Sequence, residues 1–344
     1  MTIIRNQLFW LVLFVIGIAS VAFTIHQITF KENGKIGGVN FVSPSHRSKF
    51  TDFQALQRIN AKWVAFNPYA FSRANQSQVK YDYERSWWGE KLSGIEKMVV
   101  QAKKENLKVM LKPHVWVMGQ GWCGDFDLKT EADWLIWEKD YQAYILAYSK
   151  MAERQHVELI CIGTEYKIAA TKRSQFWEQL IKEVRRVYTG KLTYAANWDN
   201  FQNIKFWNDL DYIGIDAYFP LTQDKNATTK ALNLEWKKLS STLQQFSLAH
   251  KKQLVFTEYG YKSTHFTVGK QWEIEDIKRD ENVNLPAQNK AFTALYESIW
   301  NQPWFAGGFI WKWYPEDKKA GGINNSDYTP QHKPVEEIIK QYYR

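Results

Sequence analysis

Two glutamates stand at the ends of two apolar runs, and a tyrosine follows each of them. The run ELICIGTEY carries Glu165, and the run QLVFTEYGY carries Glu258. A carboxylate at the end of a hydrophobic strand loses hydration when it is buried, so two such positions suggest a chemical purpose. A protonated carboxyl and an ionised one can serve as general acid and nucleophile. Cleavage of a glycosidic bond with retention requires such a pair, about 5–5.5 Å apart.

The elements that must position these glutamates follow one repeated pattern after residue 35. Eight apolar runs occur, at residues 37–42, 63–69, 108–115, 158–165, 191–198, 212–219, 254–261 and 305–314. Helical periodicity is found between and after them, at residues 92–106, 131–156, 173–188, 232–249, 287–301 and 335–343. This alternation predicts an α/β fold, a single (β/α)8 TIM barrel. The longest non-helical stretches, 69–91, 115–130 and 261–286, would be loops that build the walls of a cleft.

Polar and aromatic residues gather where the apolar runs end, which is where barrel enzymes build their active sites. Alternation along a strand predicts that Lys112 shares a face with His114, Asp216 with Tyr218, Phe256 with Glu258, and Trp311 with Trp313. We expect the face with the polar groups to point into the barrel mouth. The residues expected there as substrate-binding candidates are Asn67, Lys112, His114, Asn197, Tyr218, Trp311 and Trp313.

Glu165 ends the fourth run and Glu258 the seventh, and these strands face each other across an eight-stranded barrel. Their carboxyl groups could therefore straddle a bound sugar. In a retaining scheme Glu165 would be the acid/base and Glu258 the nucleophile, and the like-charge pair would raise one pKa. Tyr218 could hydrogen-bond Glu258 and hold it ionised. The alternative is that either glutamate forms an ordinary ion pair, for example with Lys112.

These residues resemble glycoside hydrolase clan A, in which the acid/base ends strand four and the nucleophile ends strand seven. Within that clan the sequence looks like family 113, whose characterised members are endo-β-1,4-mannanases. The resemblance covers about residues 36–344 and includes LKPHVWV, GQGWCGDFD, IGTEY, FTEYGY, GGFIWKWYPE and DYTPQHKPVEEII. It implies hydrolysis of β-1,4-linked mannan or manno-oligosaccharides by Glu165 and Glu258. It also implies a cleft lined by Trp311, Trp313, His114, Asn197 and Tyr218.

One position departs from the wider clan. An asparagine that contacts the sugar 2-hydroxyl commonly precedes the acid/base there, whereas Thr164 stands at that place here. The choice between mannose and glucose therefore stays open. Trp122 could be an outer sugar platform or a hydrophobic plug. Trp134, Trp137 and Tyr141 have helical spacing and should anchor their helix on the barrel rather than touch substrate.

Three other functions compete with this interpretation. Another β-glycan hydrolase, of the β-glucanase type, would use the same barrel and the same glutamates. A membrane-tethered glycan-binding protein without activity is a second alternative, although it would have no need of both acids. A barrel lyase or aldolase would need a Schiff-base lysine at a strand end, for which Lys112 is the candidate.

Cofactor and metal chemistry is not expected. The seven histidines show no metal-binding spacing. Asp125 and Asp127 lack further oxygen ligands, so they should form a turn. The two cysteines, Cys123 and Cys161, support neither a disulfide scaffold nor a zinc site, and Cys161 should be a buried free thiol.

The first thirty residues differ from the rest. Residues 8–25 carry no charge and follow Arg5, a length at the lower edge of a membrane span. We expect an anchor or a cleaved signal at residues 1–30, before a catalytic domain at 36–344, in an exported protein that is membrane-anchored or secreted. The net charge of +9 comes from scattered basic residues without an arginine-rich stripe, so nucleic acid is not an expected partner. A glycan substrate and a monomeric catalytic domain are expected.

Overall fold

The computed structural model describes residues 30, 34–47, 50–265, 267–270 and 283–344 of the chain. All the helices and strands it describes belong to the compact unit at residues 33–344. The apolar segment at residues 8–25 lies outside the described residues. Within the described part, no helix combines the length and apolar character needed to cross a membrane.

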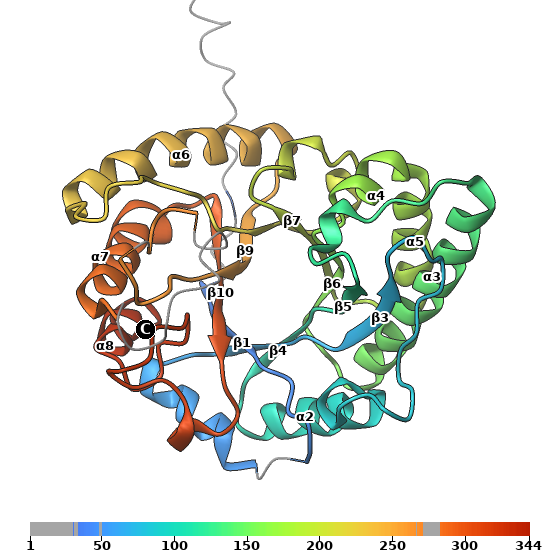
Figure 1. Cartoon of the computed structure of the whole chain (residues 1–344), viewed down its shortest axis with the longest axis horizontal. Helices are drawn as coiled ribbons and strands as arrows, with labels where there is room; N and C mark the ends of the chain where they lie inside the picture. Colours follow the sequence, from blue (N-terminus) through green and yellow to red (C-terminus); the bar gives the residue numbers. More distant parts are fainter. Residues whose placement is uncertain (1–29, 31–33, 48–49, 266, 271–282) are drawn as a thin grey trace, which may run out of the picture. The chain divides into compact units, whose positions relative to one another are not determined.

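Eight parallel strands close into a barrel, as the eight apolar runs predict (Figure 1). The order around the ring is β1-β10-β9-β8-β7-β6-β4-β2. The strands are β1 (Ile36–Phe41), β2 (Trp63–Phe66), β4 (Lys108–Leu111), β6 (Leu159–Thr164), β7 (Lys191–Asn197), β8 (Ile213–Asp216), β9 (Leu254–Tyr259) and β10 (Phe305–Trp313). The predicted (β/α)8 barrel is therefore confirmed.

Helices surround the ring on its outer side (Figure 1). The α-helices are α2 (Leu92–Lys104), α3 (Glu131–Arg154), α4 (Lys167–Lys172), α5 (Ser174–Val187), α6 (Thr229–His250), α7 (Leu285–Leu295) and α8 (Val335–Tyr342). The 3₁₀ helix η1 (Phe50–Ile59) fills the first helical position, and the π-helix η7 (Tyr296–Trp300) continues α7. Short 3₁₀ turns are η2 (Trp88–Glu90), η3 (Cys123–Asp125), η4 (Phe201–Asn203), η5 (Trp207–Asp209) and η8 (Asp317–Lys319).

The barrel interior is filled by apolar side chains from every part of the ring. The cluster consists of Ile36, Ala65, Met110, Leu159, Cys161, Ala195, Val255, Ala306 and Phe309. Small residues make room for large ones: a Cβ atom on Gly38 would lie 2.6 Å from the ring of Phe309. Cys161 is a buried free thiol, as predicted, and Cys123 is also buried and free.

Helix α3 holds β6 in place through aromatic side chains. Trp137 and Tyr141 are fully buried, and their rings stack with centroids 4.8 Å apart. The Tyr141 hydroxyl donates to the Ile162 carbonyl at 3.0 Å. Trp134 is buried beside them. The three residues therefore anchor the helix on the barrel, as predicted, and fix the strand that carries Glu165.

Two strands occur where the sequence predicts loops. β3 (Tyr69–Arg73) and β5 (His114–Met118) form a separate two-stranded parallel sheet. They continue β2 and β4 beyond the ring, because the Lys112 amide donates to the Phe66 carbonyl at 2.9 Å and the His114 amide to the Pro68 carbonyl at 3.0 Å. We call this sheet the β3–β5 ribbon.

Candidate active site

Glu165 lies directly after β6, where the chain turns into α4. Its φ of +53° lies in the left-handed region, which is uncommon for a residue with a side chain. The turn is held by its amide, which donates to the Ala195 carbonyl at 2.8 Å, and by the Lys167 amide, which donates to the Glu165 carbonyl at 2.7 Å. Residues in such conformations are concentrated at functional sites. The turn places the carboxyl group at the barrel mouth.

Trp122 contacts this carboxyl group directly. Its indole Nε1–H donates to Glu165 Oε2 at 2.6 Å. The ring lies against Gly124, where an added Cβ would be 2.3 Å from the indole, so only glycine fits beneath it. The Lys167 ammonium lies 6.0 Å from the centroid of the same ring. Turn η3 therefore positions Trp122 as a hydrogen-bond donor to Glu165 as well as an aromatic surface.

The pKa of Glu165 is raised to about 7. Burial is the main cause, because it disfavours the charged form, and the negative charge of Glu258 adds to it. The hydrogen bond from Trp122 opposes this shift, since it stabilises the ionised carboxylate. At neutral pH, Glu165 can both donate and accept a proton.

Glu258 is surrounded by donors instead. The Tyr218 hydroxyl donates to Glu258 Oε2 at 2.8 Å, and the Lys112 ammonium pairs with Glu258 Oε1. Only 7% of Glu258 is exposed, and Lys112 is fully buried. A positive charge and a hydroxyl donor both favour the ionised carboxylate. Tyr218 therefore lies where the sequence predicts it, in contact with Glu258.

A second buried carboxyl group shares Lys112. The ammonium lies 3.3 Å from Asp216 Oδ2, and the Thr257 hydroxyl donates to Asp216 Oδ1 at 2.7 Å. Asn40 Nδ2 donates to the Thr257 carbonyl at 3.0 Å and braces this layer from β1. Asp216 is a carboxylate inside the apolar run at 212–219 and the last residue of β8, and this signal in the sequence could have identified it as a site residue.

The charges of this cluster decide the state of Lys112. Burial acts to lower the pKa of Lys112, but the attraction of Asp216 and Glu258 outweighs it and raises the pKa above its ordinary range. Burial and the charge of Glu258 raise the pKa of Asp216. A protonated lysine has no free electron pair with which to form a Schiff base. This state argues against the aldolase alternative.

The sequence model of Glycoside Hydrolase Family 113 matches residues 29–333. The chain belongs to glycoside hydrolase family 113. It is a glycoside hydrolase, and the expectation drawn from the sequence motifs is confirmed. A sequence search of the curated proteins finds no match.

Solved structures of the same family have the same fold. The family 113 β-mannanase AaManA from Alicyclobacillus acidocaldarius, in complex with ManMIm, is similar with a TM-score of 0.79 and 23% identity, over 90% of this chain and 97% of that one. A family 113 β-1,4-mannanase complex gives 0.73 and 24%, over 90% and 98%. A β-glucuronidase from Ruminococcus gnavus gives 0.58 and 10%, over 90% of this chain and 50% of its own.

Three other residues that the sequence predicts to bind substrate lie at or near the barrel mouth of this family 113 protein. The His114 ring lies 4.9 Å from that of Tyr69, and burial with the nearby Lys112 charge lowers the pKa of His114 to about 3, so the imidazole is neutral. Asn67 is buried, and its side-chain oxygen has no hydrogen-bond partner among the described residues. Asn197 Nδ2 donates to Asp199 Oδ1 at 3.0 Å. The negative charge of Asp199 also helps to raise the pKa of Glu165.

Two expectations from strand alternation are wrong, because the strands change register at their ends. Between Trp311 and Trp313 the pairing of β10 with β1 shifts by one residue. Trp311 is half-buried, but Trp313 is fully buried, with the Arg58 guanidinium 5.5 Å from its ring centroid. Trp313 therefore packs toward η1 and not on the cleft surface.

The same correction applies to Phe256 and Glu258. Phe256 contacts the rings of Trp236 on α6 and Phe305, at 6.4 and 4.8 Å. The pairing of β8 with β9 shifts between Ile215 and Asp216. Glu258 therefore turns into the mouth, while Phe256 packs between the barrel and the helices.

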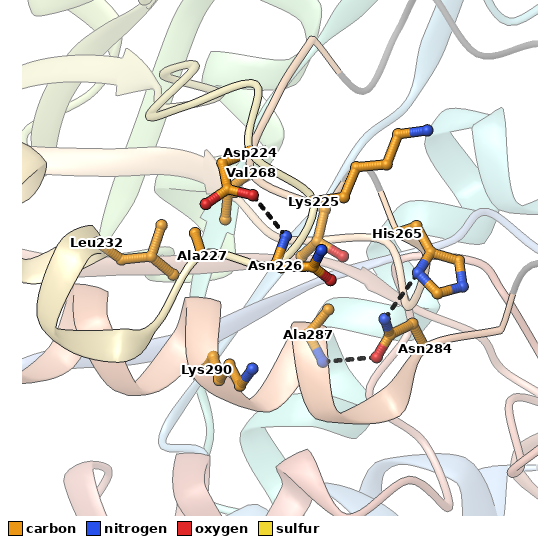
Figure 2. A pocket seen from close by; sticks show the side chains of 11 residues that line it. Asp224, Lys225, Asn226, Ala227, Leu232, His265, Val268, Asn284, Ala287 and Lys290 are labelled. Carbon is orange, nitrogen blue, oxygen red and sulfur yellow. Dashed lines mark hydrogen bonds between the residues drawn. The ribbon is translucent and has the colours of Figure 1, made fainter.

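A separate hollow of about 200 Å³ lies between the starts of α6 and α7 (Figure 2). Its polar contacts are those of turns and caps. Asn284 accepts from the Ala287 amide at 3.0 Å, its Nδ2 lies 3.0 Å from the His265 ring nitrogen, and Asp224 accepts from the Asn226 amide at 2.9 Å. A single acid, Asp224, occurs among the described residues that line it. This hollow lacks the carboxyl pair that hydrolysis needs.

Proposed function

We propose that the chain is a retaining glycoside hydrolase that cleaves β-1,4-linked mannan or manno-oligosaccharides, with Glu258 as nucleophile and Glu165 as acid/base. The observation that carries the mechanism is the contrast between the two carboxyl groups. The Lys112 ammonium pairs with one oxygen of Glu258 and the Tyr218 hydroxyl donates to the other, whereas burial and the charge of Glu258 raise the pKa of Glu165 to about 7. Two interacting acids in such different surroundings take different roles.

The first step would form a bond between a Glu258 oxygen and the anomeric carbon. The bond from that carbon to the glycosidic oxygen breaks, and Glu165 transfers its proton to the departing oxygen. The loss of the negative charge on Glu258 then lowers the pKa of Glu165, since that charge helps to raise it. Glu165 can then accept a proton from water, which attacks the anomeric carbon and releases Glu258.

The other residues of the site have supporting roles in this scheme. Lys112 and Tyr218 hold the two oxygens of Glu258, so the carboxylate can turn little. Trp122 holds Glu165 and offers its ring face to a sugar beside the acid. Neutral His114, half-buried Trp311 and Asn197 would contact sugar hydroxyls or faces at the mouth.

The sugar identity rests on the family and on structures described as β-mannanases. A β-glucan is the second candidate, and Thr164 is the observation that keeps it open. Its hydroxyl is buried and directed toward the Pro113 carbonyl at 3.5 Å. Thr164 therefore does not offer the amide that many clan members use at the 2-hydroxyl, the group by which mannose and glucose differ.

The test is a comparison of substrates. The purified protein is incubated with mannan, glucomannan, cellulose, xylan and short manno- and cello-oligosaccharides, and Glu258→Ala serves as control. Manno-oligosaccharides released by the wild type and not by the variant are the expected result. Release of oligosaccharides from the glucose-containing substrates alone would show that the specificity is for β-glucan. No product from any substrate would contradict the proposed activity.

The location of the protein remains a prediction from the sequence of residues 8–25. We propose that the catalytic domain works outside the cytoplasm, anchored by this segment or released after its cleavage. Cell fractionation with the full chain, followed by N-terminal sequencing of the product, distinguishes the two forms. Recovery of the whole chain from the cytosol would contradict export.

A further inference from the structure

The β3–β5 ribbon has one buried face and one exposed face. Residues of the buried face are small or β-branched, and they are Ala70, Ser72, Val115 and Val117. Residues of the other face are larger and pair in register across the two strands, as Tyr69 with His114, Phe71 with Trp116, and Arg73 with Met118. Trp116 is 52% exposed and Met118 42%, although both are large apolar side chains.

The ribbon is held firmly from behind. The Tyr144 hydroxyl, on α3, lies 2.7 Å from the Pro68 carbonyl and 3.1 Å from the His114 carbonyl, between which its one proton is shared. In Figure 1 the ribbon is seen on the same side of the barrel ring as helix α3, which carries Tyr144. Because its polar backbone is paired and one face is packed, the exposed aromatic face is fixed in place.

The exposed face continues the inward-facing side of the barrel. The unbroken backbone pairing of β2–β3 with β4–β5 preserves the alternation of side chains across the rim. On one strand the row runs outward from Met110 in the core through Lys112, His114, Trp116 and Met118. Lys112 in this row pairs with Glu258. The exposed aromatic face therefore begins at the nucleophile and leads away from it.

The chemistry of this face suits a chain of sugars. Its members near the mouth are aromatic, and flat rings pack well on the C–H-lined faces of pyranoses. Successive pairs stand two residues apart, so the three pairs span about 13 Å, which is longer than a single pyranose ring. Exposed large apolar side chains beside a cleft, here Trp116 and Met118, mark a binding surface.

We propose that the exposed face of the β3–β5 ribbon, with Trp116 at its centre, binds the part of a β-1,4-linked glycan chain that extends beyond the reacting sugars. This inference rests on the proposed function and adds a binding surface outside the catalytic mouth. The occupant is the substrate chain itself, because the face is continuous with the row that reaches Glu258. Sugars bound here add affinity only for substrates long enough to reach the ribbon.

The experiment measures binding as a function of chain length. Full-length protein carrying Glu258→Ala, which holds substrate without cleaving it, is titrated with mannobiose and mannohexaose by calorimetry. Trp116→Ala is added to this background, with Trp116→Phe as the variant that keeps a ring. Leu135→Ala is the matched control, since Leu135 is 56% exposed but lies on α3.

We expect Trp116→Ala to weaken mannohexaose binding by about tenfold, which corresponds to about 1.4 kcal/mol. Mannobiose binding should not change, Trp116→Phe should restore most of the loss, and Leu135→Ala should leave both ligands unaffected. An equal loss for both lengths, no loss for either, or the same loss in the control would overturn the proposal.

A separate readout keeps this test distinct from that of the proposed function. Hydrolysis of an activated aryl β-mannoside by the protein with intact Glu258 needs only the reacting centre. One outcome is that the aryl mannoside is not hydrolysed while Trp116→Ala weakens the binding of long but not short cello-oligosaccharides. That result would support the binding surface and show that the sugar identity is wrong. If the aryl mannoside is cleaved and Trp116→Ala has no length-dependent effect, the function stands and the surface is wrong.

Discussion

At the scale of single residues, the two glutamates differ in what surrounds each carboxyl group. Glu258 has a cation and a hydroxyl donor, whereas Glu165 has one indole donor and a negatively charged neighbour. A general acid must be protonated before the first step, so the rate should fall as pH rises through the pKa of Glu165, about 7. The hydrogen bond from Trp122 lowers this pKa and therefore affects the pH above which activity falls.

Replacing Trp122 by phenylalanine should move the alkaline limit of activity upward. Trp122→Phe keeps an aromatic ring but removes the N–H that stabilises ionised Glu165. A hydrogen bond to a charged group contributes about 1.5–3 kcal/mol, so the pKa of Glu165 should rise by about one unit or more. The pH profile of kcat/KM measures the shift, with Trp116→Phe as the control. An unchanged or lowered limit would contradict this role.

Glu165→Gln should separate substrates by their leaving groups. Loss of the acid should slow hydrolysis of unactivated glycosides by about 10²–10⁴-fold, because a sugar alkoxide departs poorly without a proton. An aryl glycoside with a good leaving group needs no proton, so its first step should be largely preserved. The initial burst of released phenol measures that step. Equal losses on both substrate types would count against Glu165 as the acid.

The sequence indicates the catalytic pair because both glutamates break an apolar pattern at a strand end. Tyr218 is predictable for the same reason. The sequence also suggests, as an alternative, an ion pair of Lys112 with one of the glutamates, and the structure has this pair with Glu258. The further link from Lys112 to Asp216 is not predictable, since it depends on distances set by the closed barrel. The place of Trp313 was predicted incorrectly because a one-residue change of register reverses every later side chain.

At the scale of elements, the segments between barrel strands and helices do most to shape the mouth. The apolar runs end at residues 69 and 115, shortly after Pro68 and Pro113, so the sequence assigns most of β3 and β5 to loops. In the structure each proline lies where no amide donor is needed. The amides of Lys112 and His114, on either side of Pro113, donate to the carbonyls of Phe66 and Pro68 and so pair the β4–β5 segment with the β2–β3 segment.

Turn η2 carries a buried acid outside the active site. Glu90 is only 7% exposed, and burial raises its pKa from 4.5 to about 7. Below pH 4.5 the carboxyl is protonated in both folded and unfolded chains. Above pH 7 it is ionised in both, and the folded state alone bears the loss of hydration. Stability contributed by the protonated form is therefore lost as pH rises from about 4.5 through 7.

Glu90→Gln should remove this pH dependence. Glutamine keeps an oxygen that can accept from the Trp87 amide, as Glu90 Oε2 does at 3.3 Å. The difference in free energy of unfolding, variant minus wild type, should be about 2 kcal/mol larger at pH 8 than at pH 4, because only ionised Glu90 destabilises the fold. Denaturant unfolding at both pH values measures the difference. A difference of zero or of opposite sign would show that ionisation of Glu90 does not affect stability.

At the scale of the whole molecule, the last residues of the chain close the barrel at its first strand. The Tyr343 hydroxyl donates to the Gly38 carbonyl at 2.9 Å and lies 2.6 Å from the Tyr259 hydroxyl on β9. The ring packs on Gly37, where an added Cβ would be 2.8 Å from it. One side chain thus connects strands β1 and β9, which lie on either side of β10.

Tyr343→Phe should lower stability without altering the catalytic mouth. The buried Gly38 carbonyl and Tyr259 hydroxyl would each lose a partner, so the free energy of unfolding should fall by about 1–3 kcal/mol. Thermal unfolding measures the change, with the less buried Tyr342→Phe as control. Activity of the folded variant below its unfolding transition should equal that of wild type. An effect no larger than that of the control would contradict this closing role.

The stereochemistry of the released sugar tests the central claim most directly. Mannohexaose is cleaved by the full chain in the spectrometer, and proton NMR follows the anomeric signals before mutarotation. The two-step mechanism through Glu258 predicts that the β-anomer of the new reducing end forms first. Initial appearance of the α-anomer, or no cleavage of mannohexaose, would contradict a retaining β-1,4-mannan hydrolase.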